Sequence, residues 1–365
     1  MNRPPAAVLA VDGGNSKTDL ALVAADGTLL ALVRGAGMPG HLTDATVQVV
    51  ADLVESAAAQ AGLDRPRGSG SGTGQAGLIA DHLVACVANV DLPADERQLE
   101  RMLADQGWTR TCQVANDTYA VLRAGLDDAG AAVAAESGGA RNSEAQRYWG
   151  VAVTCGAGIN CAGVAPDGRK AGFLALGDIT GDWGGGFGLG VKAQWHASRA
   201  ADLRGPATAL RHAVPAHFGL SEPDDVAEAI HRGHVAYTDL AELSLVVFEV
   251  ADAGDEVARG IVKRLAEEIY LMARSVITRL GLARLPVPVV LGGAVLAARH
   301  SLLIDQVTAL ITAEAPGAQV GVVSQPPVVG AALTGLDLAG APATAKQRLR
   351  NAFAELSEPR ERAIR

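Results

Sequence analysis

The stretch VDGGNSKTDL, from Val11 to Leu20, places a glycine pair and several hydrogen-bond donors between two apolar segments. It differs from the nucleotide-binding loop that ends in Gly-Lys-Ser/Thr. Its glycines are spaced differently, and the DLALVAADG that follows alternates like a strand instead of opening a helix. The stretch therefore predicts one of two structures, a strand–turn–strand loop that holds phosphate or a tight hairpin without a ligand.

The same arrangement occurs twice in the chain. Residues 8–33 and 150–174 both read as strand, glycine-rich turn, strand, Asp-Gly turn and strand. The Asp-Gly pairs, at 26–27 and 167–168, are signals for type I′ hairpins. Two such units in one chain indicate a duplicated domain.

Helices and strands alternate after each unit. The sequence predicts a helix between Thr43 as N-cap and Gly62 as stop. Strand, helix, strand and helix then follow in LVACVANV, LPADERQLERMLADQG, TCQVAN and DTYAVLRAG. The second half repeats this βββαβαβα order, with helical segments inserted over residues 186–252. Such alternation indicates an α/β fold with mixed sheets, and two domains of this kind would leave a cleft for ligands.

Composition restricts the classes of partner. The chain has 365 residues and a net charge of −9 without a basic cluster, which argues against nucleic acid. Its first apolar run is too short to span a membrane and lacks a signal-peptide cleavage pattern, so we expect no membrane partner and a cytoplasmic location. The cysteines form no C-x-x-C pair, which indicates free buried thiols. They are Cys86, Cys112, Cys155 and Cys161.

Two segments fall outside the repeated order. Residues 64–77, DRPRGSGSGTGQAG, are rich in Gly and Ser, and we predict a flexible linker there in preference to a mobile lid. Residues 127–147 are predicted to form a surface loop without chemistry.

Six short motifs, taken together, carry a family resemblance. They are DGGNSKTD, VANDTYAVLRAG, CGAGINCAG, GDWGGGFGLG, VVLGGAV and PPVVGAAL. From Val8 to Leu338 the chain resembles the N-acetylglucosamine kinase family, also called the BadF/BadG/BcrA/BcrD-type ATPases, of the sugar kinase, Hsp70 and actin superfamily. The resemblance implies duplicated ribonuclease H-like domains of the actin-like ATPase type that flank a cleft. We expect one domain at 1–117, with the helix at 343–365 as a candidate addition, and the other at 118–342.

The resemblance also implies roles for residues of the first half. Asp12 would hold Mg²⁺ beside the phosphates of ATP, and Asp117 would be the general base that takes the proton of the attacking sugar hydroxyl. Asp91 and Asn116 would lie at the sugar. The first phosphate loop would consist of Gly13, Gly14, Asn15, Ser16, Lys17 and Thr18.

In the second half, the resemblance assigns a second phosphate loop, an adenosine contact and two sugar contacts. The backbone of Gly156, Ala157 and Gly158 would form the opposing phosphate loop. The adenine ring would lie against Gly292 and Gly293. Asn160 and Asp182 would contact the sugar.

Several of these residues also have a purely structural interpretation. Asp12 could initiate a turn, Asp117 could cap the helix that it starts, and Asp91 could belong to the turn before a proline. Gly292 and Gly293 could serve close packing only. Both interpretations stay open at the level of sequence.

Three departures from the family pattern bear on the substrate. Trp183 stands where the family has Glu, and Ala157 and Ile159 replace hydroxyl residues of the second loop. Residues 38–40, Met-Pro-Gly, take the place of an Asn that contacts the acetamido group. These departures predict that N-acetylglucosamine is not the best substrate, or at least not the only one.

The leading hypothesis is therefore an ATP-dependent kinase that phosphorylates a hydroxyl of an amino or N-acetylamino hexose. One alternative is an ATPase that activates a dehydratase or reductase through an iron–sulfur cluster, and another is a non-enzymatic sugar or nucleotide sensor. The expected cofactors are ATP and Mg²⁺, the expected partner is a small sugar, and a homodimer is left open.

Overall fold

The structure is a computed structural model that describes residues 6–63, 78–126 and 148–362. The predicted linker at 64–77 and the predicted surface loop at 127–147 lie outside the described residues. The chain forms two compact units, each of which is described below by itself. The first unit comprises residues 1–149, 166–169 and 323–365, and the second comprises residues 150–165 and 170–322.

A five-stranded mixed sheet forms the centre of the first unit, with the strand order β3-β2-β1-β4-β5. The first three strands are antiparallel, whereas β4 and β5 run parallel to β1. The strands are β1 (Ala6–Gly13), β2 (Lys17–Ala24), β3 (Leu29–Ala36), β4 (Ala80–Val87) and β5 (Thr109–Asn116). The helices are α1 (Asp44–Ala61), α2 (Pro93–Ala104), α3 (Asp117–Gly125), α12 (Pro327–Leu338) and α13 (Ala343–Arg362).

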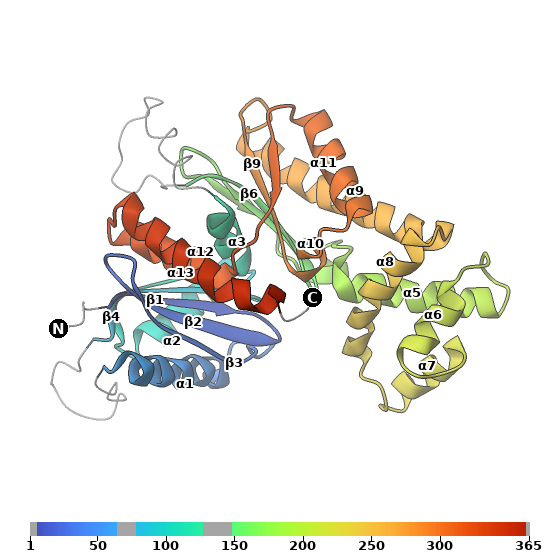
Figure 1. Cartoon of the computed structure of the whole chain (residues 1–365), viewed down its shortest axis with the longest axis horizontal. Coiled ribbons are helices and arrows are strands. Elements are labelled where there is room, and N and C mark those ends of the chain that lie inside the picture. The colour runs from blue at the N-terminus through green and yellow to red at the C-terminus, as the bar shows by residue number, and fades with distance from the viewer. Residues whose placement is uncertain (1–5, 64–77, 127–147, 363–365) are drawn as a thin grey trace. The chain divides into compact units, whose positions relative to one another are not determined.

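Helices cover both faces of this sheet, which explains why β1 and β2 are almost continuously apolar. Leu9, Leu20 and Leu22 pack on one face with α1 and α2. On the other face, Val8 and Ala10 pack with α12, and α13 lies beside α12 (Figure 1). The helix α1 begins after Thr43 and ends at the left-handed Gly62, which confirms the predicted cap and stop.

Close backbone contacts fix α12 in this unit. A Cβ on Gly330 would lie 1.8 Å from the Ala120 carbonyl oxygen, and a Cβ on Gly335 would lie 2.3 Å from the Val8 side chain. Glycine therefore lets α12 approach α3 and β1 closely. This packing explains why residues 323–365 belong to the first compact unit. The domain boundaries expected after residues 117 and 342 stay predictions.

The second unit contains a second five-stranded sheet, with the order β10-β9-β6-β7-β8. The pairing of β6, β7, β8, β9 and β10 repeats that of β1 to β5, including the two parallel pairs. The predicted duplication is confirmed. The strands are β6 (Gly150–Cys155), β7 (Ile159–Val164), β8 (Lys170–Gly172), β9 (Pro288–Gly292) and β10 (Gln319–Val322).

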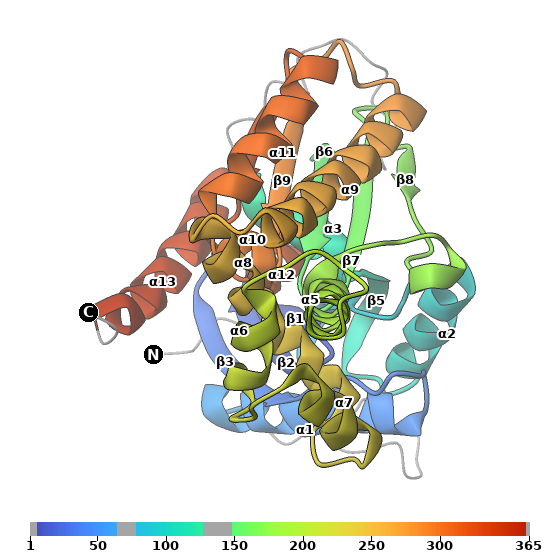
Figure 2. The same ribbon diagram turned by 90° about the vertical axis from the view of Figure 1, so that its right-hand side faces the viewer.

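Helices of the second unit form a layer on its sheet and an inserted cluster. Figure 2 shows α9 and α11 side by side, and α9 packs on β6 and β7. The layer consists of α9 (Glu256–Leu280), α10 (Ala294–Ala297) and α11 (Ser301–Glu314). The predicted insertion contains α5 (Gly185–Ala201), α6 (Leu210–His217), α7 (Pro223–His231) and α8 (Leu243–Asp252), with a short 3₁₀ turn at Tyr237–Glu242. Another 3₁₀ turn, Gly177–Ile179, precedes the insertion.

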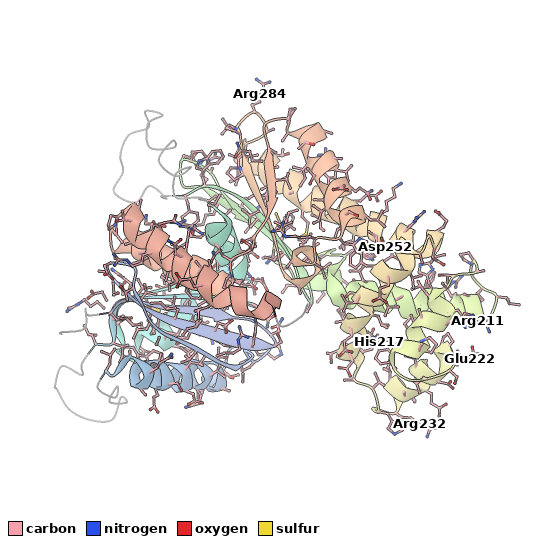
Figure 3. All side chains as sticks on the ribbon, in the orientation of Figure 1. Arg211, His217, Glu222, Arg232, Asp252 and Arg284 are labelled. Atoms are coloured by element: carbon pink, nitrogen blue, oxygen red, sulfur yellow. The ribbon has the colours of Figure 1, made fainter. Side chains whose placement is uncertain are left out.

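Charged side chains lie on the surface of the inserted helices. Arg211 on α6 approaches Glu222 at 3.6 Å, and Figure 3 labels both residues. The His217 side chain lies 3.1 Å from Glu242. Exposed pairs of this kind contribute little to stability, so apolar packing holds the insertion together. No helix among the described residues combines the length and the apolar character that crossing a membrane requires.

The type I′ hairpins predicted at the Asp-Gly pairs are wrong. That turn needs a positive φ at both central residues, but among these pairs only Gly27 (84°) and Gly168 (88°) have one. In the β2–β3 connection, the Gly27 N–H donates to the Ala24 carbonyl and the Ala24 N–H donates to the Thr28 carbonyl, both at 2.9 Å. This connection is a type I turn followed by a glycine bulge, and the glycine is still required.

Candidate functional site

Polar residues gather at one edge of the first sheet. Asp12 lies near the end of β1, Asp91 follows β4, and Asn116 ends β5. These strands are parallel, so their carboxyl ends meet at the same edge, where ligands bind in open α/β sheets. Asp117 follows as the first residue of α3.

Burial and neighbouring charges both act on the Asp12 carboxyl. Burial raises the pKa of Asp12 to about 8, and the neighbouring negative charge of Asp117 adds to this rise, as does Asp19. Lys17 and Arg34 act in the opposite direction on the same pKa. Burial is thus the main reason why the ionised form of Asp12 is disfavoured, and the two cations do not offset it.

Asp19 occupies the position next to Asp12 across the β1–β2 pair. Its carboxylate accepts hydrogen bonds from Nε of Arg34 at 2.6 Å and from a terminal guanidinium nitrogen at 2.9 Å. The Lys17 Nζ lies 3.7 Å from the same carboxylate. Arg34 and Lys17 therefore bind the Asp19 carboxylate directly, and their charges lower the pKa of Asp12 without cancelling its rise.

The end of β5 separates the roles of Asn116 and Asp117. The Asn116 side-chain oxygen accepts from the Thr118 N–H at 2.9 Å, so Asn116 is the N-cap of α3. Its amide nitrogen donates to Asp91 at 2.8 Å. Asp117 is not needed as the cap. Burial raises its pKa to about 6, although hydrogen bonds from Thr118 lower it.

The first glycine loop is a tight β1–β2 turn. The Gly14 N–H donates to the Lys17 carbonyl at 2.9 Å. Asn15, Ser16 and Lys17 are exposed, whereas Thr18 is fully buried. The Thr18 hydroxyl makes no hydrogen bond within the described part of the chain. Thr18 therefore belongs to the packing of the loop.

Met38 covers this loop from the segment that follows β3. Its N–H donates to the Gly14 carbonyl at 2.9 Å, and its side chain is 5% exposed. A Cβ on Gly13 would lie 2.7 Å from the Met38 Cε. The Met38 side chain is thus buried in the packing of the loop. A side chain at position 13 would collide with Met38, which favours glycine there.

In the second unit, the loop of Gly156, Ala157 and Gly158 joins β6 to β7. The carbonyls of Gly156 and Ala157 accept from the N–H groups of Gly186 and Phe187, at 2.7 and 3.1 Å. The loop therefore rests on the first turn of α5. Ile159 is 8% exposed, so its side chain belongs to the core.

Gly292 and Gly293 lie where β9 meets α10. Gly293 has a φ of 88°, and a Cβ there would lie 2.5 Å from the backbone of Cys155, at the end of β6. The positive φ and the close contact are each sufficient reason for glycine at position 293, with or without a ligand. The turn also comes close to the loop at 156–158, since the Ala294 nitrogen lies 4.0 Å from a Cβ built on Gly156.

The remaining predicted residues of the second unit have local partners. The Asn160 side-chain oxygen accepts from the Cys161 N–H at 2.7 Å. Asp182 accepts a hydrogen bond from the Thr180 hydroxyl. Trp183 lies under the guanidinium of Arg264, 5.8 Å from ring centre to Cζ, so the indole has a cation–π partner.

The first unit contains one carboxylate, Asp12, whose surroundings bear on the predicted Mg²⁺ contact. Mg²⁺ is usually held by one or two protein carboxylates together with water and phosphate oxygens. Within the described ranges, no cluster of three or more His, Cys, Asp or Glu side chains is placed to hold a metal. Asp12, whose charge is disfavoured by its surroundings, is the carboxylate that a cation would stabilise most.

The raised pKa of Asp12 predicts a stability change in Asp12→Asn. A carboxyl whose pKa rises from 3.8 to about 8 on folding favours the folded state below pH 3.8, and this contribution is lost as the pH rises through about 8. At pH 9 the wild type must carry the buried charge, whereas the variant does not. We expect the advantage of the variant over the wild type to grow between about pH 4 and pH 8, and to be larger at pH 9 than at pH 5 by at least about 1.4 kcal/mol, the equivalent of one pKa unit.

Urea unfolding of the metal-free protein at both pH values measures this difference. Asp105→Asn, at an exposed carboxylate, is the matched control and should show no such pH dependence. An advantage of Asp12→Asn that is equal at the two pH values would contradict the raised pKa.

Comparison with known proteins gives a consistent set of relatives. The chain matches the BadF/BadG/BcrA/BcrD ATPase family over residues 9–335. It is 26% identical over 293 residues to the N-acetylmuramic acid/N-acetylglucosamine kinase of Clostridium acetobutylicum, covering 79% of this chain and 85% of the relative. It is 29% identical over 195 residues to the N-acetyl-D-glucosamine kinase of Dictyostelium discoideum, covering 52% of this chain and 60% of that one.

The fold also matches a solved structure. A candidate N-acetylglucosamine kinase from Chromobacterium violaceum superposes with a TM-score of 0.65 and 22% identity, over 91% of this chain and 99% of that one. At this identity the match shows the shared fold.

Proposed function

Because the chain belongs to the BadF/BadG/BcrA/BcrD ATPase family, we propose that it is an ATP-dependent kinase acting on a hydroxyl of an amino or N-acetylamino hexose. The names of the curated relatives support this substrate class. The observation that carries the proposal is the pair of carboxylates, Asp12 and Asp117, at the carboxyl edge of the first sheet.

Asp117 is the general base of the proposed reaction. Its pKa of about 6 leaves it ionised near neutral pH, and a base works best when its pKa lies close to the working pH. The sugar oxygen forms a bond to the γ-phosphorus of ATP, the bond from that phosphorus to the ADP oxygen breaks, and the hydroxyl proton passes to Asp117. Asn116 holds the first turn of α3 and so positions this carboxylate.

Other residues bind the two substrates in this proposal. Asn15, Ser16 and Lys17 are exposed on the first loop and would offer donors to the phosphates. The backbone at 156–158 would form the second phosphate loop, and Gly292 and Gly293 would face adenosine. Asp91 would contact the sugar from the first unit, and Asn160 and Asp182 from the second. Mg²⁺, which Asp12 would hold, supplies positive charge to the phosphate oxygens when it is bound.

The cysteines argue against the iron–sulfur activator. Burial raises the pKa of Cys112 and Cys155 to about 12, and it also raises that of Cys161. A cluster is held by cysteine side chains, and one that bridges two subunits needs them at the surface, whereas Cys86, Cys155 and Cys161 are buried. The non-enzymatic sensor remains the second candidate, because Ala157 and the buried Ile159 supply no hydroxyl to the second loop.

A turnover assay with a panel of sugars tests the proposal. We expect Mg²⁺- and ATP-dependent release of ADP with N-acetylglucosamine, N-acetylmuramic acid, N-acetylmannosamine, glucosamine or glucose. Met38 and Trp183 are both engaged in packing, so we expect a sugar other than N-acetylglucosamine to match or exceed its kcat/KM.

Three outcomes of the assay are informative. A strict preference for N-acetylglucosamine would contradict the substrate prediction but not the kinase. A wild type that is stabilised by ATP and turns over no sugar would support the sensor. A wild type with neither property would contradict both functions.

A further inference from the structure

The segment after β4 connects two parts of the site in the first unit. The Ala88 N–H donates to the Gly13 carbonyl at 2.7 Å, so this segment starts against the first glycine loop. Asn89 then adopts a left-handed conformation, with a φ of 63°. The chain turns there and reaches Asp91.

Side chains of this segment form hydrogen bonds with both the first glycine loop and the end of β5. The amide nitrogen of Asn89 donates to the side-chain oxygen of Asn15, which lies 74 positions away in the chain and belongs to the first loop. At the end of β5, Asp91 accepts from Asn116 at 2.8 Å. Asn116 in turn caps the helix that begins with Asp117. A continuous path thus runs from the first glycine loop to the first turn of α3.

The residue type at position 89 fits two requirements at once. The left-handed conformation disfavours ordinary residues and is tolerated by Gly and by Asn. Glycine would meet the backbone requirement alone. Asparagine adds the amide group that contacts Asn15. The contact is therefore a feature beyond what the turn itself needs.

We propose that Asn89 is a positioning residue, which couples the first glycine loop to the helix turn that holds the base. This inference rests on the proposed kinase function. Asn15 lies in the exposed part of the first loop, and its side-chain oxygen accepts from Asn89. Asn89 makes this contact from the same segment that contacts Asn116 through Asp91.

A double-mutant cycle on Asn15 and Asn89 tests the coupling. Asn89→Gly keeps the turn and removes the amide, and Asn15→Ala removes the acceptor. Asn89→Gly should lower kcat about fivefold, as expected for the loss of one hydrogen bond, with an unchanged Tm and a smaller change in the sugar KM. Asn15→Ala should cost at least as much, because it also removes the donor proposed for the phosphates, and the double variant should be no worse than Asn15→Ala. Asn89→Asp, which tolerates the turn but cannot donate, should behave like Asn89→Gly.

Hydrogen exchange gives a readout that does not depend on turnover. In the free protein, Asn89→Gly should accelerate amide exchange about fivefold in peptides covering residues 13–18 and 114–120, and leave peptides of α9 unchanged. Multiplicative effects in the cycle, or unchanged exchange at 114–120, would overturn the coupling. If the wild type turns over no sugar while the exchange result holds, then the kinase proposal fails and the coupling stands.

Discussion

Asp117→Asn is expected to lower kcat by on the order of a hundred- to ten-thousand-fold, the usual cost of removing a general base. The variant keeps the size of the side chain but cannot accept the proton of the attacking hydroxyl. Asn116 is the cap of α3, so the helix keeps its N-terminal hydrogen bond. The Tm should not fall, because the wild-type carboxylate is itself destabilised by burial.

The pH dependence sharpens this prediction. In the wild type, kcat/KM should fall below about pH 6, because Asp117 is then protonated and cannot act as a base. The residual activity of Asp117→Asn should lack this acidic limb. Sugar and ATP affinities, measured by calorimetry, should change within a few-fold only, since the amide can still hydrogen-bond the hydroxyl.

The control for this experiment is Asp105→Asn, an exposed carboxylate at the end of α2, which should keep wild-type kcat. Turnover of Asp117→Asn above about a tenth of wild type lies outside the range for a general base. Such a result would remove Asp117 from the proposed chemistry and make Asp182 the next carboxylate to test.

Asp337→Leu is expected to have the largest effect on stability, about 3–5 kcal/mol. Asp337 on α12 accepts from Arg123 on α3 at 2.7 Å, and the Lys346 Nζ on α13 lies 2.5 Å from its other oxygen. The Arg123 side chain is 1% exposed. Removal of the shared anion leaves this guanidinium buried without its carboxylate, although it also lies 5.5 Å from the Tyr148 ring centre.

Arg123→Met is the matched variant, and it should cost less than Asp337→Leu. In that variant Asp337 keeps Lys346 as its partner. The double variant should recover part of the loss, because replacing a whole buried ion pair by apolar groups is often neutral. Urea unfolding measures all three variants. A cost below about 1 kcal/mol for Asp337→Leu, or a larger cost for Arg123→Met, would contradict the expected penalty for a buried guanidinium without its carboxylate.

The elements of the fold could be predicted from local sequence. Each of their signals lies within a few neighbouring residues of the sequence. The structure confirms the strand–turn–strand units, the cap at Thr43 and the stop at Gly62. The type of the Asp-Gly turns could not be predicted in this way. An Asp-Gly pair fits both a two-residue turn and the last two positions of a three-residue loop, so the pair alone does not fix the register.

Contacts between distant segments were beyond sequence reasoning. Asp337 contacts Arg123 across 214 positions, and Asn89 contacts Asn15 across 74. In both cases the partners lie on elements whose packing depends on the whole sheet. Asn89 had a weak local signal, as an Asn just after a strand, which is a common place for the left-handed conformation. The roles assigned to the site residues remain predictions.

The docking of α12 also determines the order in which the first unit can be completed during synthesis. Its sheet is encoded before residue 117, but the helix that covers the Val8 and Ala10 face starts at Pro327. On the ribosome, the whole second unit emerges in between. That apolar face therefore stays exposed to solvent during most of translation, which proceeds at about 5–20 residues per second. We expect chaperones to bind a nascent chain that exposes such a surface.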